Sequence, residues 1–169
     1  PDRWAVLARD GFSGVLLWRR PFSGWGPGAW DNAKHWSTPV SQPRRLVAVG
    51  ERVYVTLGYR APVSVLDART GQLMRVLDQT GNTEEIVWVD GILLVRQRKE
   101  IPNYPPGATA WNVQVRRSGK KIPAEWTRLP TPPGGETIAA IQTDTGEVLW
   151  RWPEQRIVTL SLAALDGRV

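Results

Sequence analysis

The stretch Asp67-Ala-Arg-Thr-Gly71-Gln-Leu-Met-Arg75 decides the fold, because the 169-residue chain contains three versions of it. The other two are Asp10-Gly-Phe-Ser-Gly14-Val-Leu-Leu-Trp18 and Gln142-Thr-Asp-Thr-Gly146-Glu-Val-Leu-Trp150. The spacing is typical of a hairpin turn with a bulge: Gly accepts a positive φ, and the Asp and Ser or Thr oxygens can accept hydrogen bonds from turn amides. A strand follows each turn, and we expect its second and fourth residues after Gly to share one face.

A second repeated unit alternates with the first. It consists of an apolar strand, a tight turn and another apolar strand, and it occupies residues 46–55, 85–95 and 162–169. Asp90-Gly91 and Asp166-Gly167 are favoured two-residue hairpin turns, and Gly50-Glu51 suits a turn with Gly first. No segment has helical periodicity over three turns. The two units together predict four-stranded antiparallel modules and an all-β chain.

We expect these units to form one domain over 1–169. A Pro- and Gly-rich stretch interrupts the second complete module, and such a composition does not suit central strands. The expected parts are a trailing hairpin at 4–19, a Trp-rich loop at 22–43, modules at 46–77 and 86–152 with an insertion at 98–136, and opening strands of a further module at 157–169.

Composition excludes several classes of protein. The absence of Cys excludes a disulfide scaffold, a thiolate zinc site and a cysteine nucleophile. The formal net charge is +6, but the basic residues are dispersed, so we expect no nucleic-acid partner. No apolar run approaches the roughly 18 residues needed to cross a bilayer, so we expect no membrane insertion. The start at Pro1 lacks both an initiator Met and a signal-peptide profile, which suggests a processed or excised chain.

Candidate binding residues are few. His35 is the single histidine and has no catalytic motif around it, so we interpret it as a surface-loop residue. Trp25, Trp30 and Trp36 lie within twelve residues of one another. Exposed indoles at this density could stack on sugar rings or bases, whereas buried ones would anchor a long loop to the protein surface. The sequence leaves both interpretations open.

The Thr-Gly motifs, with the hairpins between them, resemble the repeats of the PQQ-like β-propellers, the eight-bladed quinoprotein family. This resemblance implies an all-β, partial β-propeller of four-stranded antiparallel blades, in which the motif Trp docks between neighbouring blades. The structural motif residues are Asp10, Gly14, Trp18, Asp67, Thr70, Gly71, Thr145, Gly146 and Trp150. Arg75 replaces Trp in the middle copy and Gln142 replaces the leading Asp in the last. We expect Arg75 to hold its charged end in water or against an acid, and Trp18 and Trp150 to be buried between sheets.

The same family holds different activities, so the fold does not settle the function. Its alcohol and sugar dehydrogenases hold PQQ and a metal at the propeller axis, whereas the outer-membrane protein assembly lipoprotein is a noncatalytic scaffold. The chain lacks cysteines and has no recognisable axial Glu, Asn and Asp set, so the resemblance implies a noncatalytic binding or scaffold module without a cofactor. The alternatives are part of a dehydrogenase that uses PQQ with calcium, and a carbohydrate-binding propeller. Both family branches imply a periplasmic or otherwise extracytoplasmic setting in bacteria.

The spacing of the motifs sets the number of blades. Gly14, Gly71 and Gly146 lie 57 and 75 residues apart, which leaves room for about two and a half blades. A closed propeller needs about four blades or more. We therefore expect a fragment of a larger protein, with missing blades or other protein chains covering its open sheet edges.

Overall fold

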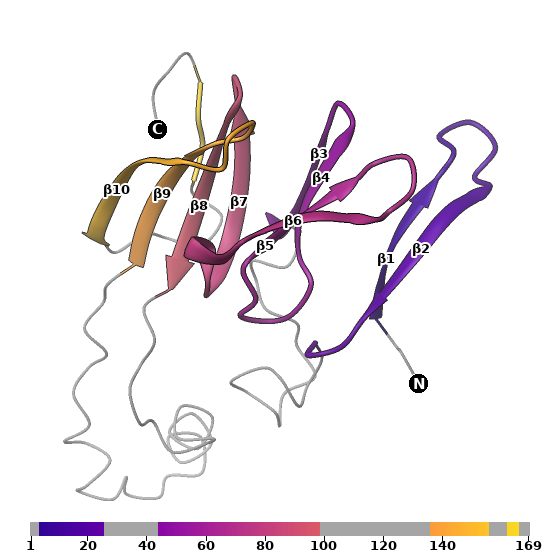
Figure 1. Cartoon of the computed structure of the whole chain (residues 1–169), viewed down its shortest axis with the longest axis horizontal. Coiled ribbons are helices and arrows are strands. Elements are labelled where there is room, and N and C mark those ends of the chain that lie inside the picture. Colours follow the sequence, from indigo (N-terminus) through magenta and orange to yellow (C-terminus); the bar gives the residue numbers. More distant parts are fainter. Residues whose placement is uncertain (1–3, 26–43, 99–135, 156–161, 166–169) are drawn as a thin grey trace, which may run out of the picture.

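The computed structural model describes residues 4–25, 44–98, 136–155 and 162–165 (Figure 1). These residues form ten β-strands and no α-helix, which confirms the all-β prediction for this part of the chain. Most of the Trp-rich loop and nearly all of the Pro-rich insertion lie outside the described residues, as do Asp166 and Gly167. The strands are β1 Trp4–Arg9, β2 Leu16–Phe22, β3 Leu46–Val49, β4 Arg52–Thr56, β5 Val63–Asp67, β6 Leu73–Leu77, β7 Thr83–Val89, β8 Ile92–Arg98, β9 Glu136–Gln142 and β10 Val148–Gln155.

The strands form three antiparallel sheets, and within each sheet strands that follow one another in sequence are paired. The N-terminal hairpin is β1 with β2, the central sheet is β3 to β6, and the C-terminal sheet is β7 to β10. Figure 1 shows the three sheets standing in a row, with the central sheet between the other two. A single 3-10 turn at Asp78–Thr80 links the central and C-terminal sheets.

Turn chemistry explains the tight connections. Asp90 and Gly91 between β7 and β8 have φ values of 45° and 81°, the two positive values that a type I′ hairpin requires. Gly50, which opens the turn between β3 and β4, has a φ of 55°. The two-residue turns predicted at these positions are therefore confirmed.

Apolar side chains fill the spaces between the sheets. On β5, Val63 and Val65 belong to the cluster shared with the C-terminal sheet, and Leu66 belongs to the cluster shared with the N-terminal hairpin. The central sheet is thus covered on both faces, which explains why this short strand is buried along most of its length. A third cluster covers the far face of the C-terminal sheet, where Leu162 packs against Leu94, Ile138 and Ala140.

The prediction that the second and fourth residues after each motif Gly share a face is wrong. In the C-terminal sheet, Val148 packs toward the central sheet, whereas Trp150 pairs with Ala140, a residue of the cluster on the far face. The reason is a register shift between Val148 and Trp150, and equivalent shifts occur in the other two motif hairpins. A β-bulge adds one residue to a strand, so the residues after the bulge face the opposite side of the sheet.

Candidate functional site

The turn at 67–71 is closed by its own side chains. The Asp67 carboxylate accepts hydrogen bonds from the amides of Arg69 and Thr70 at 2.9 and 2.8 Å, and from the Thr70 hydroxyl at 3.0 Å. The Gly71 amide donates to the Asp67 carbonyl at 2.8 Å. The bonds from the hydroxyl and amide of Thr70 lower the pKa of Asp67.

The turn at 10–14 has the same construction. Asp10 accepts from the amide and hydroxyl of Ser13, each at 2.7 Å, and the Gly14 amide donates to the Asp10 carbonyl at 2.9 Å. Gly14 and Gly71 share a φ of 70°. The backbone and side-chain hydrogen bonds from Ser13 lower the pKa of Asp10. The two turns therefore share the same hydrogen-bond pattern and the same backbone conformation at Gly.

Trp18 joins the N-terminal hairpin to the central sheet. Its indole Nε1 donates to the carbonyl of Ala68 at 2.9 Å, within the turn at 67–71. A Cβ added to Gly71 would lie 2.5 Å from the Trp18 ring, so this position must be Gly for its contact as well as for its φ. Arg20, two residues later, donates to the Gly71 carbonyl at 3.0 Å.

Arg75 joins the central sheet to the C-terminal sheet at the equivalent place. Its guanidinium donates to the carbonyls of Thr143 and Thr145 at 2.9 and 2.8 Å, and a Cβ on Gly146 would lie 3.0 Å from its Nη1. The expectation that the charged end lies in water or against an acid is met only in part, because its bond to Thr145 is exposed and its bond to Thr143 is partly buried. Backbone carbonyls of the facing turn accept its hydrogen bonds, as the Ala68 carbonyl accepts one from Trp18.

Trp150 occupies the third equivalent position. It lies on the face of the C-terminal sheet that looks away from the central sheet, and it is 41% exposed. No further sheet follows it among the described residues. The expectation of an indole buried between two sheets is therefore not met within this part of the chain.

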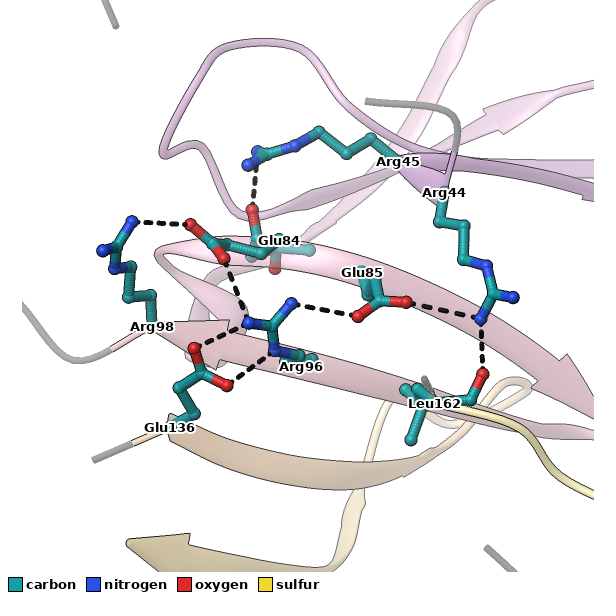
Figure 2. A network of polar contacts seen from close by, with 9 residues as sticks. Arg44, Arg45, Glu84, Glu85, Arg96, Arg98, Glu136 and Leu162 are labelled. Carbon is teal, nitrogen blue, oxygen red and sulfur yellow. Dashed lines mark hydrogen bonds and ion pairs between the residues drawn. The ribbon is translucent and has the colours of Figure 1, made fainter. Parts of the chain in front are cut away.

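A buried ion network fastens the strands of the C-terminal sheet (Figure 2). Arg96 on β8 is 2% exposed, and it contacts Glu85 on β7 at 3.0 Å, where the carboxylate is fully buried. The same guanidinium forms a bidentate ion pair with Glu136, with N–O distances of 2.6 and 2.8 Å, and it lies 3.6 Å from the carboxylate of Glu84. Burial is the largest single influence and opposes the charge of Arg96, but the hydrogen bonds and charges of Glu136, Glu84 and Glu85 together outweigh it and raise the arginine's pKa.

Two arginines just before β3 extend this network toward the central sheet (Figure 2). Arg44 reaches Glu85 at 3.3 Å and also donates to the carbonyl of Leu162, so it bridges two elements. Arg45 is buried and donates to the carbonyls of Tyr59 and Thr83 at 2.6 and 2.7 Å. Burial lowers the pKa of Arg45. The network therefore holds the central sheet, the C-terminal sheet and the segment at 162–165 together.

Among the three loop tryptophans, the structure places Trp25 alone. Its ring makes edge contacts with Trp4, Phe22 and Tyr59 at centroid distances of 6.0 to 6.5 Å, and the Arg45 guanidinium lies 5.3 Å from its centroid. These contacts favour an anchoring role for Trp25, because stacked binding platforms use open ring faces. Trp30, Trp36 and His35 lie outside the described residues.

The sequence reasoning missed the ion network. Arg96 and its partner Glu84 lie outside the repeated units, and its partner Glu85 is only the first residue of the unit at 85–95. One signal was present: Arg96 directly follows the apolar run Leu93-Leu94-Val95 within one strand. A charge inside an apolar strand needs a partner, because burying it alone is costly.

Neither a metal-binding group nor a membrane-spanning helix occurs in the described residues. There, no three His, Cys, Asp or Glu side chains are grouped so that they could hold a metal ion. The described part of the chain also has no helix long and apolar enough to span a membrane. Comparison of the sequence with protein-family models and with curated proteins gives no match.

Proposed function

We propose that the chain is a noncatalytic scaffold module made of propeller-type blades, and that it forms part of a larger bacterial protein in the periplasm. The repeated contact between sheets carries this proposal. Trp18 and Arg75 stand at equivalent positions, and each donates hydrogen bonds to the glycine turn of the next sheet. A repeat built this way adds sheets in a row and leaves binding faces at both ends.

The stacking of the sheets supports blade geometry. Successive sheets pack face to face, and β3 lies against β7, so the first strands of two successive sheets are neighbours. In a propeller, the first strand of each blade lies beside the central channel. The antiparallel order within each sheet fits a blade as well.

The scaffold function is tested against the quinoprotein alternative by titrating the chain with PQQ and calcium ions, followed calorimetrically. We expect no saturable heat of binding and no dye-linked oxidation of alcohols or sugars. Micromolar binding together with such oxidation would overturn the proposal. Screening of a glycan set, before and after changing Trp25, Trp30 and Trp36 to Ala, tests the carbohydrate alternative: binding that depends on these residues would replace the scaffold function.

A further inference from the structure

The two ends of the row of sheets carry complementary halves of the same contact. At one end, the turn at 10–14 has the hydrogen bonds and the φ of the docked turn at 67–71. A Cβ on Gly14 would meet nothing within 4 Å among the described residues, whereas one on Gly71 would strike the docked indole. At the other end, Trp150 offers an exposed indole.

The direction in which the side chains at the three equivalent positions point agrees with this complementarity. Trp18 and Arg75 both point toward the sheet that follows them in the chain, and Trp150 lies on the corresponding face of its own sheet. The contact inside the chain also shows which carbonyl should accept the Trp150 bond. Ala68 directly follows Asp67, and Gly11 directly follows Asp10, so the Gly11 carbonyl is the equivalent acceptor.

Both terminal faces expose apolar side chains. Leu7 and Leu16 lie on the face of the N-terminal hairpin opposite to Trp18, and both are exposed. Trp152 is exposed beside Trp150, on the same face of the C-terminal sheet. At the two internal contacts, by comparison, the facing surfaces are covered by apolar clusters. Leu162 covers Leu94, Ile138 and Ala140 on the C-terminal end face, so the exposed apolar surface of the sheet there is limited to the end strand that carries Trp150 and Trp152. Exposed apolar side chains of this kind are ones that interfaces bury.

We propose that a second copy of this chain docks head to tail, with the Trp150 indole of one copy on the turn at 10–14 of the next. The inference rests on the proposed scaffold function and names a partner for it. A second copy is the fitting occupant because one chain carries both halves of the contact at opposite ends of its row of sheets (Figure 1). Such an interface is heterologous, so copies add until a ring closes or a filament grows.

Sedimentation velocity over a wide range of chain concentration tests the proposal. The wild-type chain should form assemblies that grow with concentration. Trp150→Ala should weaken association about thirtyfold, the loss typical of an interface hot spot. Gly14→Ala should weaken it as well, because the added Cβ meets nothing within 4 Å among the described residues but would meet the incoming indole, while the strain of Ala at a φ of 70° is the same in free and docked chains. Met74→Ala removes an exposed apolar side chain away from both faces and should leave association unchanged.

Mixing the two variants gives the decisive measurement. Trp150→Ala chains keep the turn and Gly14→Ala chains keep the indole, so an equimolar mixture should form pairs that cannot grow further. A wild-type chain that stays monomeric at every concentration overturns the proposal and assigns both faces to adjoining units of a longer chain. Association that survives both substitutions, or a mixture without pairs, also overturns it. Circular dichroism confirms that each variant is folded, and the PQQ titration reports separately on the scaffold function.

Discussion

Changing Arg96 to Met removes the centre of the buried ion network while it keeps most of the aliphatic volume of the side chain. Among the described residues, the fully buried Glu85 would then keep Arg44, at 3.3 Å and itself partly exposed, as its charged partner. Breaking a buried pair costs about 3 to 5 kcal/mol, because the remaining charge is left desolvated. With Arg44 still in place, we expect a loss near the lower limit, about 3 kcal/mol.

Arg98 provides a matched control on the same strand. It is 45% exposed and contacts Glu84 at 3.4 Å. Exposed pairs of this kind contribute about 0 to 1 kcal/mol, so Arg98→Met should change the free energy of unfolding very little. The two substitutions are chemically the same and differ in burial, so their difference measures what burial of the charge costs.

Urea unfolding followed by fluorescence distinguishes the two variants. With a urea dependence of about 2 kcal/mol per molar, Arg96→Met should lower the unfolding midpoint by about 1.5 M, and Arg98→Met by less than about 0.5 M. Adding Glu85→Gln to Arg96→Met removes the stranded charge and should recover part of the loss. Equal midpoint shifts for the two single variants, or no recovery in the double variant, would refute the reasoning.

Three further predictions concern the contacts between sheets. Gly71→Ala should destabilise the chain by about 1 to 3 kcal/mol more than Gly14→Ala. Both substitutions place Ala at a strained positive φ, but only the Cβ at position 71 would overlap the Trp18 ring. The urea midpoints of the two variants measure the difference. Trp18→Ala should cost about 3 kcal/mol, and Trp150→Ala about 1 kcal/mol, because the exposed indole has less contact to lose; thermal melts at low chain concentration compare them. The folded-state pKa of Asp67 is lowered, so its contribution to stability is present above its ordinary pKa of 3.8 and disappears as the pH falls through the folded value. Asp67→Asn should therefore be less stable than wild type at neutral pH and approach it in acid, as urea midpoints at the two pH values would show.

Local chemistry explains how much of the fold could be predicted. The hairpin at Asp90-Gly91 depends on two adjacent residues that accept positive φ, and the turns at 10–14 and 67–71 depend on bonds across three residues. All the residues that such a turn needs lie within a few positions of one another, so the sequence alone indicates the turn. These turns set strand order as well, because strands joined by tight turns must pair.

Long-range partners explain what could not be predicted. Arg96 and Glu136 are 40 residues apart, and Arg44 and Glu85 are 41 apart. The residues around each member of a pair do not indicate which distant side chain it will contact in the fold. Arg96 and Glu136 are close because β8 and β9 pair within one sheet, whereas Arg44 and Glu85 are close because the central and C-terminal sheets pack against each other. A bulge was predicted at the turn, but the register shift between Val148 and Trp150 lies inside the following strand, and strict alternation takes no account of an inserted residue there.

The middle contact shows why residue identity alone is a weak guide to this repeat. Arg75 replaces the motif Trp, yet its guanidinium donates to three backbone carbonyls of the next sheet, whereas Trp18 donates to one. Indole and guanidinium are both flat groups that carry N–H donors in their plane. What the contact requires is therefore a flat donor on one sheet, with a Gly of positive φ and an open carbonyl on the next. Trp150 meets the first requirement and the turn at 10–14 meets the second, so the rule taken from the two internal contacts predicts the one between copies.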